Sequence, residues 1–118
     1  MEIDIQYITD MLEKLTNTPS PTGNTAEAMN IVREELERFS VGTAVTHKGS
    51  LIGTIKGANE AMERTLSAHV DTLGAMVKEI KSGGTLAISN IGGFMGQSVE
   101  GANCTIETLS GSRYSGTI

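Results

Sequence analysis

The period at which apolar residues recur changes near Val41, and this change limits the fold more than any other feature of the sequence. Over residues 4–16 and 24–40, apolar side chains recur every three or four positions, which is the period of one helix face. Over residues 41–46 and 51–55, the residues alternate and many are β-branched, which is typical of the two strands of a hairpin. The chain is therefore expected to begin with two helices and to continue as strands.

Capping and helix-breaking residues mark the limits of the two predicted helices. Asp4 is the predicted N-cap of the first helix. The segment Pro19–Gly23 contains two prolines and a glycine and cannot continue a helix, so it is interpreted as a turn between the two helices. Asn24, followed by Glu27 three residues later, predicts a capping box at the start of the second helix.

Strands account for the rest of the sequence. Five further strands are predicted, at residues 65–70, 74–80, 85–89, 103–109 and 114–118. The 14 glycines lie mostly after the predicted helices, where they suit the turns between these strands. This order of elements indicates an α/β fold in two parts, an α/β layer over residues 1–71 with two helices and three strands, and a separate small β domain over residues 72–118.

Charge and composition exclude several classes of function. The sequence has 14 acidic and 9 basic residues, a formal net charge of −5, and no cluster of Lys and Arg, so no binding to nucleic acid or to a membrane is expected. It has no apolar run of membrane-spanning length, and its acidic N-terminus is unlike a secretory signal. The single cysteine, Cys104, cannot form an intrachain disulfide, and a reducing cytoplasm is the expected location.

His69-Val70-Asp71 is the motif that carries chemistry. It follows the predicted strand at residues 65–70, and ligands of α/β sheets collect at the carboxyl ends of strands. Residues two apart in an extended chain point to the same side, so both side chains can face one site. The neutral His69 imidazole is a suitable metal ligand, and the Asp71 carboxylate, the candidate catalytic group, would accept its other N–H and orient it. The alternative is a strand-end histidine that pairs with its neighbour and binds nothing.

The residues around this motif resemble the first metal-site segment of the tetrahedral aminopeptidases, a family that includes glutamyl aminopeptidases. The matching pattern is Ala-His-x-Asp followed by a Gly-x-Met-Val strand, here within Ala68–Val77. Asn90–Phe94 resembles the Ile-Gly-Gly-aromatic turn of the family, and Gly96–Val99 with Tyr114–Ile118 resembles its later strands. Upstream, Pro19–Gly23 and the helix after it resemble the family's loop between its first two helices. The resemblance covers nearly the whole chain, in order.

The resemblance implies a metal-dependent aminopeptidase that removes N-terminal residues from short peptides. Members use two divalent metal ions, such as zinc, cobalt or manganese, which share a bridging aspartate, and a glutamate that acts as general base. Only the first metal ligand and its orienting carboxylate map onto this sequence, at His69 and Asp71 respectively. The other ligands would lie beyond the equivalent of Ile118. The chain is therefore expected to be a portion of a longer enzyme, with neither peptidase activity nor tight metal binding by itself.

The resemblance also implies a particular architecture and assembly. Residues 1–71 would be the N-terminal part of a phosphorylase/aminopeptidase-like catalytic α/β domain. Residues 72–118 would be the start of an inserted small β-barrel domain that guides dimerisation. An incomplete barrel leaves open strand edges, so self-association into a homo-oligomer is expected.

Two other functions remain open. A related two-metal hydrolase of the carboxypeptidase or deacylase type would also carry a strand-end His-x-Asp, but it would continue within the catalytic domain rather than into a β-only segment. A non-catalytic assembly or binding module would have no metal affinity. Four carboxylates are conceivable substitute metal ligands but are expected to be solvated, namely Glu63, Glu79, Glu100 and Glu107.

Overall fold

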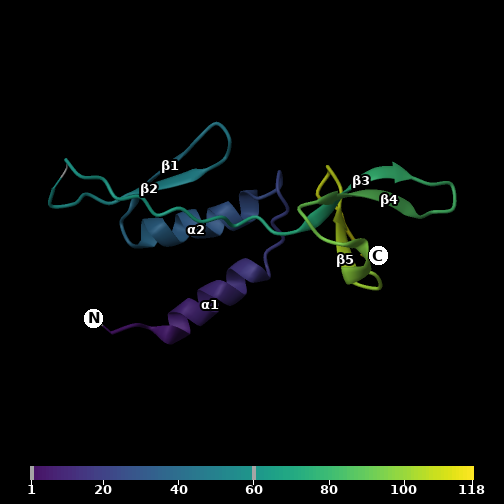
Figure 1. The fold of residues 1–118 in the computed structure, drawn as a ribbon, viewed down its shortest axis with the longest axis horizontal. Coiled ribbons are helices and arrows are strands. Elements are labelled where there is room, and N and C mark those ends of the chain that lie inside the picture. Colours follow the sequence, from purple (N-terminus) through teal and green to yellow (C-terminus); the bar gives the residue numbers. More distant parts are fainter. Residues whose placement is uncertain (1, 60) are drawn as a thin grey trace.

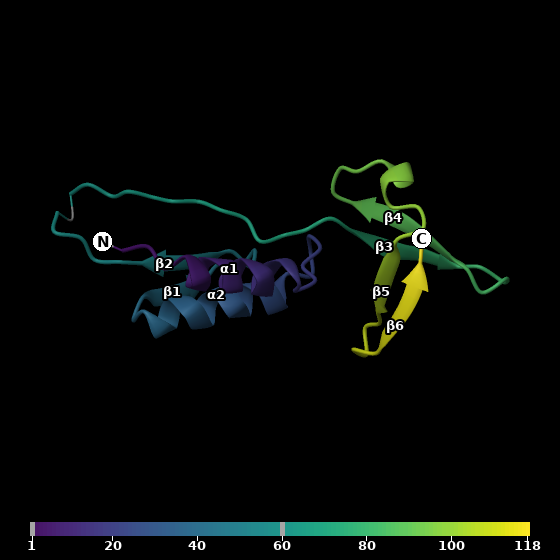
Figure 2. The same ribbon diagram turned by 90° about the horizontal axis from the view of Figure 1, so that it is seen from below.

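Two lobes lie at opposite ends of an elongated molecule in the computed structural model, which describes residues 2–59 and 61–118. The molecule measures 63 × 33 × 27 Å (Figure 1). We call residues 2–59 the helical lobe, residues 74–118 the β lobe, and residues 61–73 the connecting segment. Figure 2 shows the connecting segment running alongside the helical lobe before it enters the β lobe.

The helical lobe begins with two helices, α1 (Ile5–Thr16) and α2 (Ala26–Arg38), at the predicted positions. The predicted N-cap of α1 is confirmed, because the Asp4 carboxylate accepts a hydrogen bond from the Tyr7 amide at 2.9 Å. The Tyr7 hydroxyl ties α1 to α2 by donating to the Glu35 carboxylate at 2.8 Å. No helix in the described part of the chain has the length and apolar character needed to cross a membrane.

The predicted capping box at the start of α2 is wrong. The N-cap residue is Thr25, and its side chain makes no capping hydrogen bond. Asn24 lies one position too early, because its amide donates to the Pro21 carbonyl at 2.8 Å and closes a turn. The turn chemistry of the proline-containing loop therefore determines where α2 begins.

The predicted hairpin follows α2. Its strands, β1 (Gly42–Val45) and β2 (Leu51–Thr54), pair antiparallel and both contact α2. Gly53 permits the close approach of hairpin and helix, because a Cβ at this position would lie 3.2 Å from Leu36 Cδ1. The hairpin is therefore packed against α2 through backbone as well as side chains.

The third strand predicted for residues 1–71 is not formed. Residues 65–70 lie in the connecting segment, and none of them pairs with any strand among the described residues. A strand requires a neighbour for its backbone hydrogen bonds, and β1 and β2 pair with one another alone. The described residues before Gly74 thus form two strands instead of three, and the fold remains α/β.

The β lobe contains two more hairpins, and its four predicted strands are confirmed. Strand β3 (Gly74–Ile80) pairs antiparallel with β4 (Leu86–Ile91), and β5 (Asn103–Glu107) pairs antiparallel with β6 (Arg113–Thr117). A 3₁₀ turn, η1 (Gly96–Ser98), lies between the hairpins. The described strands form three separate two-stranded sheets, so closure into a barrel stays a prediction.

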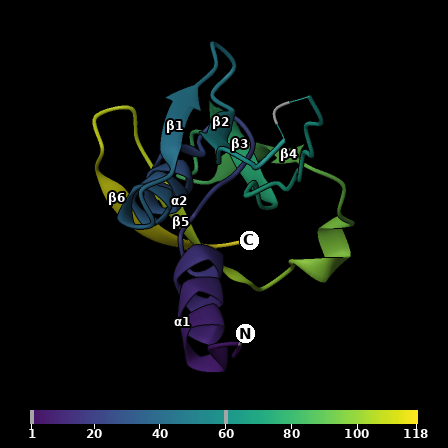
Figure 3. The ribbon, with the colours of Figure 1, turned by 90° about the vertical axis from the view of Figure 1, so that its left-hand side faces the viewer.

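Burial is slight throughout the molecule. Among the described residues, Ala28 and Ser20 are the buried ones, at 1% and 0% exposure. The solvent-accessible surface is 9996 Å², whereas a compact domain of this mass exposes about 6,100 Å². One reason is that α1 lies apart from the hairpins (Figure 3), and its Ile5, Ile8 and Leu12 are at least half exposed. Hydrogen bonds between neighbouring segments therefore hold most elements, and the apolar faces of these elements remain exposed to solvent.

Candidate functional site

The loop between α1 and α2 lies against the end of the connecting segment, and this contact positions the candidate site. The Thr72 amide donates to the Ser20 carbonyl at 2.8 Å, and Pro21 forms a parallel bridge with Thr72. A Cβ at Gly74 would lie 2.6 Å from Pro21 Cβ, so a residue without a side chain is required at this close approach. We call the contact of Ser20 and Pro21 with Thr72 and Gly74 the joint.

The two predicted site residues lie together directly before the joint. His69 Nδ1 is 2.8 Å from Asp71 Oδ1. Because a carboxylate only accepts hydrogen bonds, we place the imidazole proton on Nδ1, which leaves a lone pair on Nε2. The His69 side chain is 84% exposed, so its ring is accessible to a ligand. The arrangement is the one that metal-binding histidines commonly adopt, although the roles of the two residues stay predictions.

A third residue contacts this pair, and sequence reasoning missed it. The Thr22 hydroxyl donates to Asp71 Oδ2 at 2.7 Å, across 49 positions of sequence. The interpretation of residues 19–23 as a turn accounts for the backbone of the loop but not for this side chain. No spacing rule connects residues so far apart, and the one available signal was the resemblance of the whole loop to a metallopeptidase family.

These hydrogen bonds lower the pKa of Asp71. The Thr22 hydroxyl, and after it the His69 ring, hold the pKa of the Asp71 carboxyl below its ordinary value of 3.8. Burial acts weakly in the opposite direction, because the side chain is still 40% exposed. At neutral pH the group is therefore a carboxylate that accepts one hydrogen bond at each oxygen.

His69 is the predicted metal ligand, and Asp71 is the group predicted to orient it. Within residues 2–59 and 61–118, no three His, Cys, Asp or Glu side chains lie close enough together to hold a metal ion. None of the four conceivable substitutes therefore completes a set with His69 and Asp71, namely Glu63, Glu79, Glu100 and Glu107. Since a catalytic zinc site takes about three protein ligands, His69 and Asp71 do not make such a site by themselves, and the role of His69 as one ligand of a larger set stays a prediction.

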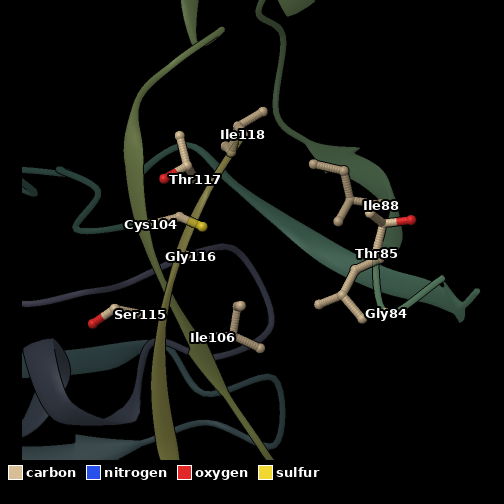
Figure 4. A pocket seen from close by; sticks show the side chains of 10 residues that line it. Gly84, Thr85, Ile88, Cys104, Ile106, Ser115, Gly116, Thr117 and Ile118 are labelled. Carbon is tan, nitrogen blue, oxygen red and sulfur yellow. The ribbon is translucent and has the colours of Figure 1, made fainter.

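A hollow of about 530 Å³ lies between strand β4 and the β5–β6 hairpin, among residues other than those of the joint (Figure 4). Ile88 on one side faces Cys104 and Ile106 on the other. The lining contains no charged residue, and its thiol, Cys104, is free. Without an acid, a base or a pair of metal ligands, this hollow offers apolar contact and no hydrolytic chemistry.

The two predicted site residues lie within the part of the chain that matches a known protein family. The family model of the M42 glutamyl aminopeptidases matches residues 49–118. The matched stretch begins in the β1–β2 hairpin and includes the connecting segment with His69 and Asp71, as well as the whole β lobe. The loop that carries Thr22 lies before the matched residues.

Proteins similar to the chain include two proposed aminopeptidases and a proposed hydrolase. YhfE of Bacillus subtilis, a proposed aminopeptidase, is 51% identical over 109 residues, which make up 92% of this chain and 32% of YhfE. A proposed aminopeptidase of Acetivibrio thermocellus is 32% identical over 84 residues, or 71% of this chain and 25% of that protein. A proposed LysW-lysine/LysW-ornithine hydrolase of Pyrococcus abyssi is 33% identical over 73 residues, or 62% of this chain and 21% of that protein. The chain thus spans about a third or less of the length of these relatives.

Proposed function

The chain belongs to the M42 glutamyl aminopeptidase family, and from this we propose that the protein acts as a metal-dependent aminopeptidase that removes N-terminal residues from short peptides. One observation carries the proposal: the family match includes the connecting segment, in which His69 and Asp71 are hydrogen-bonded at 2.8 Å. Similarity to two proposed aminopeptidases supports the same class of reaction.

The contribution of this chain is to place one metal ligand. Two divalent ions, of zinc, cobalt or manganese, would when bound polarise the scissile carbonyl and generate hydroxide near neutral pH. His69 would bind one of them through Nε2. Asp71 would hold the proton of the imidazole on Nδ1, which fixes the tautomer and increases the basicity of Nε2. Asp71 would therefore act through His69, as a positioning residue.

The same proposal covers architecture and assembly. Residues 1–71 would belong to the catalytic α/β domain and residues 72–118 to an inserted β domain, with the boundary in the connecting segment just before β3. The hairpins of the β lobe leave backbone edges open, and such edges favour pairing with another copy. We therefore propose a homo-oligomer. The single cysteine supports a reducing cytoplasm as its location.

The activity is tested on the protein as its source cell makes it. A tripeptide with a free amino terminus, such as Leu-Gly-Gly, should lose its first residue, and the N-acetylated tripeptide should stay intact. A chelator should abolish cleavage, and zinc, cobalt or manganese should restore it. Equal cleavage of the acetylated peptide would rule out an aminopeptidase, and cleavage that survives complete metal removal would rule out metal dependence.

The 118-residue chain alone is expected to be inactive, because its described residues supply one ligand of the required set. Incubation of the zinc-loaded chain with an aminoacyl-p-nitroanilide should release no more nitroaniline than a chain-free control. Release above that control would contradict the expectation. An antibody against α1 would show the mass of the protein in cell lysate, which we expect to be well above that of the chain.

A related deacylase- or carboxypeptidase-type hydrolase is the second candidate, favoured by the similarity to the proposed LysW-lysine/LysW-ornithine hydrolase. N-acetyl-leucine separates the two candidates, since a deacylase would cleave it and an aminopeptidase would not. A protein that cleaves neither substrate and binds no zinc would instead fit a non-catalytic assembly module.

A further inference from the structure

Thr22 connects the loop between the helices to the predicted metal ligand. We infer that Thr22 is a positioning residue of the metal site: its hydroxyl fixes the Asp71 carboxylate so that the His69 imidazole presents Nε2 to a divalent cation. The inference rests on the proposed function and adds to it a residue that lies outside both the His-x-Asp motif and the matched part of the family.

Hydrogen bonds at both oxygens restrict the rotation of the Asp71 carboxylate. Thr22 Oγ1 is 2.7 Å from Oδ2, and His69 Nδ1 is 2.8 Å from Oδ1. Hydrogen bonds to a charged acceptor are about twice as strong as neutral ones, and turning the carboxylate would break one or both. The Thr22 hydroxyl therefore sets the direction in which Asp71 offers its other oxygen to the imidazole.

His69 depends on Asp71 for its orientation. Its side chain is 84% exposed, so packing does little to hold the ring. Besides the carboxylate, Nδ1 has the Asp71 carbonyl at 3.2 Å, which is a longer contact from the same residue. If the Asp71 carboxylate rotates, the orientation of the imidazole bonded to it therefore changes as well.

The joint holds Thr22 in place without help from the hydroxyl. Thr22 directly follows Pro21, whose ring limits backbone rotation, and Pro21 is bridged to Thr72 and packed on Gly74. The backbone bond from Thr72 to the Ser20 carbonyl fixes the loop on its other side. Because these contacts already hold the loop, the Thr22 hydroxyl is not needed to fold it. The hydrogen bond of this hydroxyl to Asp71 acts on the candidate site instead.

The test compares three variants of the full-length protein. Thr22→Val removes the hydroxyl and keeps the branched shape, Thr22→Ser keeps the hydroxyl, and Thr18→Val removes a hydroxyl of the same loop that donates to the Lys14 carbonyl at 2.8 Å. Zinc affinity is measured by competition with a chromophoric chelator. Thr22→Val should weaken zinc binding measurably, but by less than the roughly 10- to 100-fold that follows the loss of a group bonded directly to a metal ligand, because Thr22 acts through Asp71. Thr22→Ser and Thr18→Val should bind zinc like the parent.

A second measurement needs no metal. In metal-free protein, the nitrogen chemical shifts of the His69 ring should report the Nδ1-protonated tautomer in the parent and in Thr22→Ser, and a mixture of tautomers in Thr22→Val. Equal zinc affinity in Thr22→Val and the parent would overturn the inference, and so would equal losses in Thr22→Val and Thr22→Ser. If the parent itself binds no zinc, the proposed function fails, and an unchanged tautomer in Thr22→Val would then show that Thr22 does not position His69 either.

Discussion

In the helical lobe, α2 packs against its hairpin, whereas the β lobe keeps two hairpins apart. In the helical lobe, α2 contacts both strands of its hairpin, and Ala28 on α2 is 1% exposed. In the β lobe, a hollow of about 530 Å³ lies between the hairpins, and no described residue is buried. Backbone pairing alone therefore forms a hairpin, but side-chain burial is what joins one element to the next.

The two lobes should consequently differ in how much they depend on further protein surface. An isolated two-stranded hairpin is marginally stable in water, and the β lobe consists of two of them. The helical lobe adds helix–hairpin contact and is tied to the connecting segment at the joint. The joint is therefore the best place to test the comparison between the lobes. Its contacts hold the two lobes in their arrangement relative to each other.

The largest effect is expected from Gly74→Ala at the joint. The new methyl group would lie 2.6 Å from Pro21 Cβ, and a proline ring cannot move aside as a flexible side chain can. Overpacking of this kind costs about 1–3 kcal/mol, which corresponds to a roughly 5- to 150-fold larger equilibrium constant for opening of the joint. Hydrogen exchange of the Thr72 amide, which is bonded to the Ser20 carbonyl, measures this opening directly.

Gly116→Ala in β6 is the matched change inside the β lobe. Its methyl group would meet Ile106 Cδ1 at 3.0 Å, the far end of a flexible side chain that can rotate toward the hollow. We expect little change in the exchange of the Thr72 amide. Faster exchange in Gly116→Ala than in Gly74→Ala would mean that the hairpins, and not the joint, control how the lobes are held.

Elements that depend on neighbouring residues could be predicted from the sequence. Helix α1 follows from its apolar period and from Asp4, whose carboxylate bonds to the amide three residues later. The hairpins follow from alternation and from turns that contain glycine, as at Gly49 and Gly84, which adopt positive φ. Each of these signals spans a few residues, so the interaction that forms the element is visible in the same stretch of sequence.

Features that depend on distant residues could not be predicted in this way. The third strand fails because residues 65–70 find no partner strand among the described residues, which their own composition does not reveal. The start of α2 at Thr25 rather than Asn24 depends on the turn closed with Pro21. The hydrogen bond from Thr22 to the predicted site crosses 49 positions, and only folding brings the two residues together.

An intermediate effect is expected from removing the N-cap side chains of the two helices. These changes compare α1 with α2 inside the helical lobe. Asp4→Ala removes the side-chain bond to the Tyr7 amide, and losses of this kind cost about 1 kcal/mol of helix stability. Thr25→Ala removes a side chain that makes no capping bond, so α2 should change less. Amide exchange at Tyr7 and at Met29, in the first turns of α1 and α2, measures the two effects. A larger loss in Thr25→Ala would contradict this assignment of the caps.

The smallest effect is expected from the ion pair that links the lobes. Arg113 on β6 lies 3.3 Å from the Glu27 carboxylate on α2, and both side chains are more than half exposed. Exposed pairs contribute about 0–1 kcal/mol and weaken with salt. Arg113 also lies 3.7 Å from Glu107 in its own hairpin, so it keeps a partner when Glu27 is lost.

A double-mutant cycle of Glu27→Gln and Arg113→Gln, read by urea denaturation at low and high salt, measures this ion pair. Glu34→Gln is the matched control, because Glu34 lies on the same helix and forms no ion pair with any described residue. We expect a coupling of at most about 1 kcal/mol that disappears at high salt. A larger coupling that persists in salt would mean that the ion pair is shielded from solvent and holds the lobes together as firmly as the joint does.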